Sequence, residues 1–300
     1  MEVITAKIEE TRAVGVREKL AAYLELSKPR IAFMLVLTAA AGFYLGSAKG
    51  FDVVLFVNTI IGITLLAFGV ATLNQVWERK TDALMERTAN RPLPTNKVSM
   101  TEAIVFGVSL CIVSEIYIAV LVNVLTAILG LVVIVGYNLL YTPLKTRTSL
   151  STAIGALPGA LPPLMGFTAA ANGITLGAWS LFTILFLWQF PHFLAIAWMY
   201  KEQYAKAGIK MLPVVEPSGR ITAQQIVVFT LMLLPISLTP YFLGMSGVIY
   251  LIGASVLGVW FLAASIKAAR AKSIEQSRKL LLVSVLYLPL LFALMVFNHQ

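Results

Sequence analysis

Nine long apolar runs, separated by short polar segments, dominate the pattern of hydrophobic and polar positions along this chain. A helix needs about 20 mainly apolar residues to cross the hydrocarbon region of a bilayer, and each run approaches that length. We therefore predict nine transmembrane helices, at about 31–48, 53–76, 103–122, 124–141, 151–171, 177–200, 224–243, 247–266 and 280–297.

Two joints between these runs carry no charged residue. They lie near Asn123 and at Gly244–Gly247, where the spacing leaves room only for tight hairpins. The helix count depends most strongly on these two places, because a missed hairpin would reverse the orientation of every later helix.

The distribution of basic residues supports the count and orients the chain. Of the 23 Lys and Arg residues, 22 fall before the first helix or between helices 2–3, 4–5, 6–7 and 8–9, and Lys49 is the exception. Basic loops tend to stay on the cytoplasmic side. We predict a cytoplasmic N-terminus and an outer C-terminus. The net charge of +9 then follows from topology, and no nucleic-acid partner is needed to explain it.

Composition agrees with an all-α, polytopic membrane protein. The chain is 59% hydrophobic and only 12% charged, with a mean hydropathy of +0.85. We expect residues 1–28 to form a cytoplasmic amphipathic segment rather than a signal or transit peptide. Residues 29–300 are expected to form one membrane domain around a central cavity. The single cysteine, Cys111, excludes an intrachain disulfide.

The most informative segment follows the second apolar run and reads NQVWERKTDALMERTANRPLP. Asn74, Glu78 and Asp82 are spaced by four residues, so a helix would place them on one face with a drift of roughly 40° per step. Arg87 and Arg91 follow, and we expect the helix to continue until Pro92 and Pro94 end it. Oxygen ligands for a hard cation beside guanidinium groups suit a diphosphate. We also expect Asp82, so close to the membrane surface, to be solvated.

Two more predicted cytoplasmic loops carry candidate polar groups. Tyr141 and Lys145 are four residues apart, with Arg147 beyond them and Pro143 expected to end the helix. An interfacial Tyr and a snorkelling Lys would explain the pair without any function. The loop after the sixth run contains an unexpected acid, Glu202, among the basic residues Lys201, Lys206 and Lys210.

Ionisable residues within the runs are candidate functional groups because they are costly in a bilayer. His192 follows Pro191 and lies roughly 12 Å from the cytoplasmic end of its run. A buried histidine can equally be a hydrogen-bonded packing residue. We expect Glu115 to satisfy a neighbouring helix and His299, at the chain end, to be frayed.

These motifs resemble those of the UbiA-type intramembrane prenyltransferases, and in particular their haem-farnesylating branch. The resemblance extends from SKPR at 27–30 to the ninth run. It includes an Asn-x3-Asp-x3-Asp motif in which Glu78 replaces the middle Asp, a Tyr-x3-Lys element, and WQxPHF around His192. The loop ending in MLPVV also fits, but the acid usual before Tyr204 is Gln203 here, which leaves Glu202 as the nearest acid.

The resemblance implies transfer of a farnesyl group from farnesyl diphosphate to a vinyl group of haem b, with addition of water, giving haem O. It implies a site at the cytoplasmic face of the cell (inner) membrane, with Mg²⁺ as cofactor and membrane lipid as surroundings. Haem A synthase or terminal-oxidase assembly factors would be the protein partners. Metal ligation is expected from Asn74, Glu78, Asp82 and Glu202. The catalytic residues would be Asn74, Glu78 and Asp82 together with Arg87, Arg91, Tyr141 and Lys145. The substrates would be bound by Lys28, Arg30, Arg147, His192 and Lys201.

Other functions fit parts of the same pattern. A related prenyltransferase acting on an aromatic acid or quinone precursor would share the diphosphate motif but not WQFPHF. A secondary transporter should carry ionisable groups on several helices near the bilayer midplane, whereas here Glu115 stands nearly alone. A catalytically silent assembly factor would not need Asn74, Glu78 and Asp82 in phase.

Overall fold

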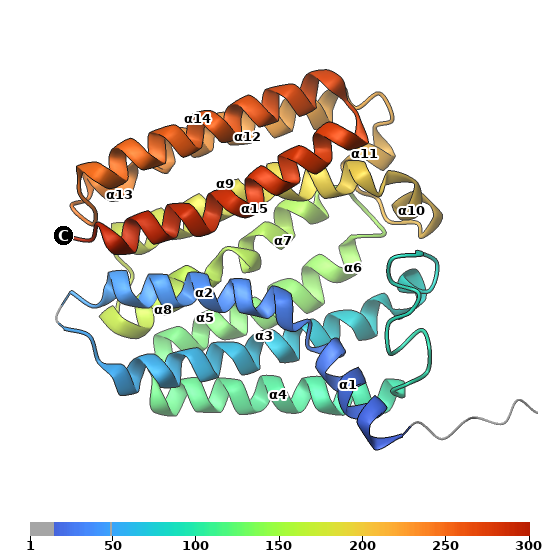
Figure 1. Ribbon diagram of the computed structural model, residues 1–300. Helices are drawn as coiled ribbons and strands as arrows, with labels where there is room; N and C mark the ends of the chain where they lie inside the picture. Colours follow the sequence, from blue (N-terminus) through green and yellow to red (C-terminus); the bar gives the residue numbers. More distant parts are fainter. Residues whose placement is uncertain (1–14, 49) are drawn as a thin grey trace, which may run out of the picture.

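The computed structural model describes residues 15–48 and 50–300, and it is helical throughout its main elements (Figure 1). Within these residues nine segments are long and apolar enough to cross a membrane, as the sequence predicted. Of the expected 1–28 segment, residues 15–28 are described and include α1 (Val16–Leu26), while 1–14 lie outside the described residues, as does Lys49.

The membrane segments begin and end within about four residues of the predicted ranges, except that the second and eighth end later and the ninth begins earlier than predicted. Several of them are interrupted by a proline or a change of helix type. They comprise α2 (Pro29–Gly46), α3 (Val53–Asp82), α4 (Met100–Leu121), α5 (Val124–Ile134) with η1 (Val135–Tyr141) and α6 (Thr142–Leu144), α7 (Ser151–Gly159) with α8 (Leu161–Ala171), α9 (Leu176–Met199), α12 (Arg220–Ile236) with α13 (Thr239–Phe242), α14 (Val248–Ala271) and α15 (Ile274–Phe297).

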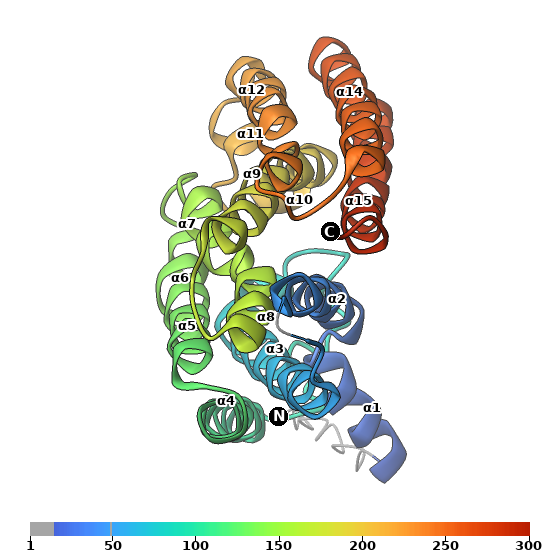
Figure 2. The same ribbon diagram turned by 90° about the vertical axis from the view of Figure 1, so that its left-hand side faces the viewer.

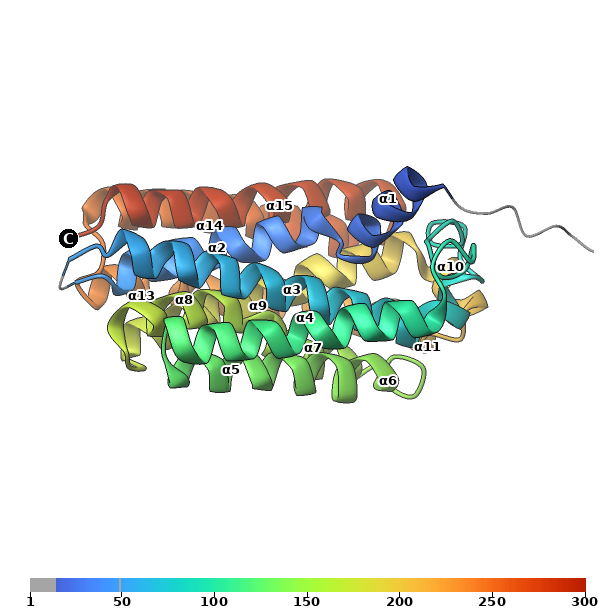
Figure 3. The same ribbon diagram turned by 90° about the horizontal axis from the view of Figure 1, so that it is seen from below.

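The long helices run side by side, so their ends gather at two opposite faces (Figures 1 and 3). One face carries α1, the loop after α3, the end of α6, and the short helices α10 (Lys201–Lys206) and α11 (Leu212–Val215). The C-terminus lies at the opposite face. The three loops that carry the candidate functional residues therefore meet at one end of the bundle. This agrees with the prediction that they lie on the same side of the membrane.

Seen along the helices, α8 and α9 lie inside the bundle, while α4, α5 and α14 lie toward its outside (Figure 2). The segments that contain α7, α8 and α9 are the most buried of the membrane segments. The outer helices expose large apolar side chains, such as Val105 and Ile116 on α4 and Val256 on α14. This distribution suits a lipid solvent, in which outer helices need no polar face.

Both uncharged joints are tight hairpins, as predicted. Asn123 caps α5, because its side-chain oxygen accepts a hydrogen bond from Thr126 N at 2.8 Å while its amide nitrogen donates to Thr168 O at 3.0 Å. At the second joint Gly244 adopts a positive φ of 70°. The prediction that His299 frays is wrong: its Nδ1 donates to Met245 O at 2.7 Å, so the chain end closes this hairpin.

Two expectations about helix ends and pairing also fail. The helix with the diphosphate motif stops at Asp82, well before Pro92, because the chain folds back and Thr88 Oγ1 donates to Asp82 O at 2.9 Å. Glu115 was expected to satisfy a neighbouring helix, but its Oε1 is buried without a hydrogen-bond partner among the described residues.

Helices α2 and α8 approach each other so closely that only glycine fits at positions 42, 46 and 166. A Cβ on Gly42 would lie 2.1 Å from Pro163 O, and one on Gly166 would lie 1.9 Å from Ala39 O. Because backbone atoms cannot move aside as flexible side chains can, this contact fixes the distance between the two helices.

We expect Gly42→Ala to lower the free energy of unfolding by about 1–3 kcal/mol, the usual range for overpacking a tight contact. Thermal unfolding in detergent would measure the loss. Gly173→Ala is the matched control, because its added methyl group would meet only Ala171 O at 3.9 Å. Equal stability of both variants would contradict the close approach of α2 and α8.

The orientation in the membrane gives a second prediction. Reporter fusions at Asn298 should behave as extracytoplasmic and fusions near Thr95 as cytoplasmic, since these positions lie at opposite ends of the bundle and the basic loops lie with Thr95. A cytoplasmic reporter at Asn298 would reverse the assignment of the two faces.

Candidate functional site

The last turns of α3 place the three motif side chains on one inward face, as their spacing predicted. Asn74 and Asp82 are each 1% exposed and Glu78 is half-buried, whereas Trp77 between them is 53% exposed. The expectation that Asp82 is solvated is wrong, because the loop after α3 folds back over it. The motif is therefore buried between the helix bundle and the folded-back loop and is not open to water.

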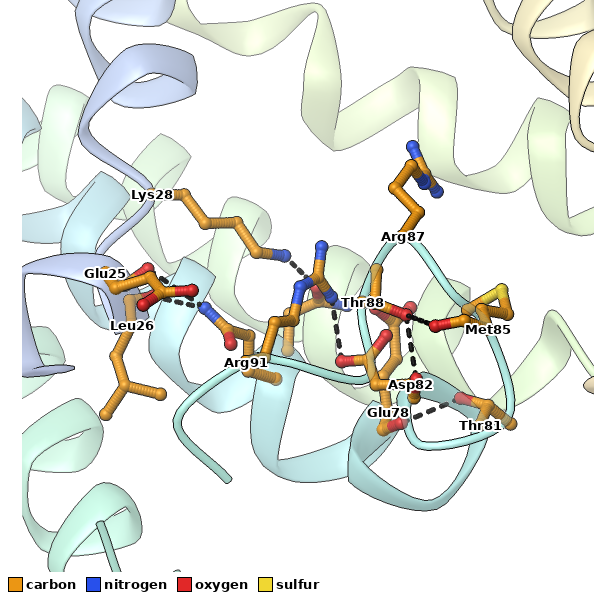
Figure 4. Close-up of polar contacts among 12 residues, drawn as sticks. Glu25, Leu26, Lys28, Glu78, Thr81, Asp82, Met85, Arg87, Thr88 and Arg91 are labelled. Atoms are coloured by element: carbon orange, nitrogen blue, oxygen red, sulfur yellow. Dashed lines mark hydrogen bonds and ion pairs between the residues drawn. The ribbon is translucent and has the colours of Figure 1, made fainter. Parts of the chain in front are cut away.

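Each of the three side chains accepts a hydrogen bond from a cation in a different part of the chain, and Figure 4 shows the pair of Asp82 with Arg91. Lys28 Nζ donates to Asn74 Oδ1 at 2.7 Å, and Lys145 Nζ donates to Glu78 Oε1 at 2.5 Å. Arg91 Nη1 donates to Asp82 Oδ2 at 2.7 Å. Asn74 Nδ2 in turn donates a hydrogen bond to Thr142 Oγ1 at 3.1 Å. We call Asn74, Glu78, Asp82 and their three cations the paired cluster.

The pKa values of Lys28 and Lys145 are shifted in opposite directions. Burial lowers the pKa of Lys28 to about 8, and the nearby Glu78 offsets this only in part. Burial also acts to lower the pKa of Lys145, but the ion pair with Glu78, together with Tyr141 and Tyr137, outweighs burial and holds that pKa well above its ordinary value. Glu78 therefore keeps Lys145 positively charged, a condition for binding an anion.

The two arginines predicted beside the motif have different partners. Arg91 turns inward to Asp82, while Arg87 points away from it (Figure 4). The Arg87 guanidinium donates to Tyr204 Oη at 3.2 Å and lies 4.6 Å from the centre of the Tyr200 ring. The Arg87 backbone N–H also donates to Gln203 Oε1 at 3.4 Å. Gln203, which stands where the family pattern usually has an acid, thus contacts the loop after α3.

Tyr141 and Lys145 form a pair, as their spacing predicted, but an unforeseen π-helix precedes it. The Lys145 ammonium lies 4.3 Å from the centre of the Tyr141 ring. Segment η1 ends at Tyr141, α6 ends one residue after Pro143, and π-helical turns often occur at functional sites. Lys145 O accepts from Lys210 N at 2.8 Å, which joins the second and third loops.

A cleft of about 230 Å³ opens next to this pair. It is lined in part by Trp77, Glu78, Thr142, Lys145, Arg147 and Ile209. It brings together residues from α3, the end of α6 and the third loop. Arg147, which the sequence assigned to substrate binding, lies at this opening and is exposed.

The structure does not bring every predicted residue into the cluster. Glu202 is exposed and takes part in no ion pair among residues 15–48 and 50–300. Lys201 donates to Pro217 O at 3.3 Å, and Arg30 is exposed on α2. His192 lies on α9, where its Nδ1 is 2.8 Å from Ser284 Oγ of α15.

Sequence reasoning missed several contacts of the site. Thr142, Tyr200 and Tyr204 all contact candidate residues. Thr142 and Tyr200 resemble ordinary interfacial residues in type and spacing, so no signal in the chain distinguished these two. Tyr204 alone was flagged, as part of the loop pattern that contains Gln203.

The donor set of the paired cluster suits Mg²⁺, which prefers oxygen ligands and keeps several waters, so two carboxylates and an amide oxygen suffice. Within the described part of the chain no group of three His, Cys, Asp or Glu side chains could hold a metal. An ion at this place would be held by Glu78, Asp82 and the amide oxygen of Asn74, with water as its other ligands.

A family model and two of the most similar relatives point to the same family of proteins. A family model described as the UbiA prenyltransferase family matches residues 35–295. A protoheme IX farnesyltransferase of Solibacter usitatus is 48% identical over 286 residues, covering 92% of this chain and 98% of the relative. The protein of the same name from Koribacter versatilis is 44% identical, covering 95% of each chain.

Solved structures show the same fold at low identity. A digeranylgeranylglyceryl phosphate synthase matches with a TM-score of 0.79 and 18% identity, covering 94% of this chain and 98% of that one. A UbiA homologue from Archaeoglobus fulgidus bound to GPP and Mg²⁺ matches with a TM-score of 0.64 and 16% identity, covering 91% and 99%. The chain is a prenyltransferase and belongs to the UbiA prenyltransferase family.

Proposed function

We propose that the protein transfers a farnesyl group from farnesyl diphosphate to a vinyl group of haem b, and that water then adds to give haem O. The observation that carries the diphosphate half is the paired cluster, where Lys28, Lys145 and Arg91 converge on three oxygen-bearing side chains. The haem half is supported by relatives named protoheme IX farnesyltransferase at 44–48% identity over nearly the whole chain.

The cations of the cluster would bind the diphosphate without leaving their present partners. An ammonium group has three N–H donors and a guanidinium five, and Lys145 and Arg91 each donate one hydrogen bond to their carboxylate partner. Asn74, Glu78 and Asp82 would hold Mg²⁺, which when bound neutralises negative charge on the leaving group. Lys28, Lys145 and Arg91 would stabilise the charge that develops as the C–O bond to diphosphate breaks.

The acceptor would then react inside the helix bundle. The electron pair of the haem vinyl group forms a bond to the farnesyl carbon that lost diphosphate. Water adds to the cation left on the vinyl carbon and releases a proton, which yields a hydroxyethylfarnesyl side chain. The apolar helices around the site would keep water from the farnesyl cation before the acceptor attacks.

We place this reaction in residues 29–300, at the cytoplasmic face of the cell (inner) membrane, with residues 1–28 as an amphipathic lead-in. The concentration of basic residues at the face that carries the paired cluster supports this side. A haem A synthase or a terminal-oxidase assembly factor would suit as a partner, because haem O is too apolar to leave the membrane freely.

The paired cluster predicts the effect of changing Asp82. Asp82→Asn keeps the side-chain volume but removes the charge, and we expect kcat to fall at least roughly 100-fold, about 3 kcal/mol of transition-state stabilisation. Asn is preferable to Ala here, because Ala would leave Arg91 without its partner and could unfold the loop.

Glu202→Gln is the matched control, and we expect a small effect because Glu202 lies outside the paired cluster. Prenyl transfer would be measured at saturating Mg²⁺ in reconstituted membranes, with thermal unfolding to check that both variants fold. Substantial activity of Asp82→Asn would remove Asp82 from the site, and equal losses would place Glu202 in it.

A competition assay with haem b and 4-hydroxybenzoate would identify the acceptor. The reconstituted protein, offered labelled farnesyl diphosphate, Mg²⁺, haem b and 4-hydroxybenzoate together, should place label in haem and none in the aromatic acid. Mass analysis should show the haem product heavier by one farnesyl group and one water. Label in the aromatic acid alone would leave prenyl transfer intact but contradict haem as the acceptor.

A further inference from the structure

Two side chains of the WQFPHF segment on α9 form hydrogen bonds with the same residue of α15, Ser284. Trp188 Nε1 donates to the backbone oxygen of Ser284 at 2.9 Å, and His192 Nδ1 lies 2.8 Å from Ser284 Oγ. The two aromatic rings stack on each other, with centroids 4.5 Å apart and planes inclined by 24°. Ser284 itself is 0% exposed, so bulk water cannot replace any of these bonds.

The hydroxyl group of Ser284 has a second short contact that decides the direction of the first. Ser284 Oγ lies 2.7 Å from Leu281 O, and a carbonyl oxygen can only accept. If the single hydroxyl hydrogen pointed to His192 instead, two oxygen lone pairs would face each other at 2.7 Å. The hydroxyl therefore donates to Leu281 O and must accept a hydrogen bond from His192 Nδ1.

We propose that Ser284 is a positioning residue that holds His192 as the Nδ1–H tautomer and leaves the Nε2 lone pair free, directed away from α15. The Trp188 stack fixes the plane of the ring, and the hydrogen bond fixes its rotation. A neutral imidazole prepared in this way is the usual form of a histidine that ligates a metal, whose other ring nitrogen donates to a second group.

The purpose of this arrangement rests on the proposed function. If haem b is the acceptor, Nε2 of His192 is a suitable axial ligand for its iron, and Ser284 would set the orientation in which the porphyrin binds. Ser284 would not touch the reacting atoms. Its loss should therefore weaken haem binding and leave farnesyl diphosphate binding unchanged.

The tautomer can be measured without any activity. The chain contains only two histidines, so ¹⁵N-histidine labelling of the protein in lipid membranes gives two side-chain signal sets, and His192→Gln identifies which belongs to His192. We expect the wild-type protein, free of haem, to show a protonated Nδ1 and an unprotonated Nε2. A protonated Nε2 would overturn the proposal, even if no Ser284 variant folds.

The role of Ser284 is tested by Ser284→Ala, which removes the acceptor but creates no steric clash. We expect part of the His192 population to shift to the Nε2–H tautomer, and the KM for haem b to rise roughly tenfold with an unchanged KM for farnesyl diphosphate. Ser265→Ala is the matched control, because Ser265 is also 0% exposed and its Oγ pairs with Thr230 Oγ1 at 2.9 Å, between α12 and α14.

The outcomes separate this proposal from the function on which it rests. An unchanged tautomer in Ser284→Ala overturns the role of Ser284, and so does a shifted tautomer with an unchanged KM for haem b. If the KM for haem b rises equally in Ser265→Ala, the change reflects only a general packing effect, and the proposed role of Ser284 is overturned as well. If the wild-type protein does not farnesylate haem at all, the proposed function fails, while the NMR result still decides the tautomer.

Discussion

The pairing of the polar side chains at the end of α3 with Lys28, Lys145 and Arg91 is the constraint on which the site depends. Charged groups removed from water are stable only when each has a partner, and losing one partner of a buried pair costs about 3–5 kcal/mol. The three cations come from the N-terminal cap of α2, the end of α6 and the loop after α3. Pairing therefore determines how these separate segments meet.

The same pairing prepares the site for an anion. Basic groups already converge before any substrate arrives, so their electrostatic repulsion is offset by Glu78 and Asp82 rather than by the ligand. The neighbouring loops are also joined to one another, through Arg87 to the end of α9 and α10 and through Lys145 O to Lys210 N. A diphosphate would meet an arrangement that needs little reorganisation.

The helices below the site supply the rigidity that this arrangement requires. Because lipid offers no hydrophobic force between helices, close packing and interhelical hydrogen bonds set their positions. The contact of Gly42 and Gly166 with the facing backbone fixes α2 against α8, and α2 carries Lys28 at its cap. Similarly, Ser284 joins α9 to α15 through its hydrogen bonds with Trp188 and His192. Small residues and single hydroxyl groups thus decide distances between elements far apart in the sequence.

The sequence by itself determined the features that depend on local spacing and on the membrane. Run length and charge distribution predicted nine spanning helices and both tight joints, and four-residue spacing put Asn74, Glu78 and Asp82 on one face, because helical geometry and bilayer thickness act on each segment independently. Only the tertiary structure decided which cation pairs with which oxygen, that α3 ends at Asp82, that Arg87 and Arg91 point in different directions, and that His299 is ordered. Those outcomes depend on which distant segments meet, and the pattern within one segment carries no information about its partners in space.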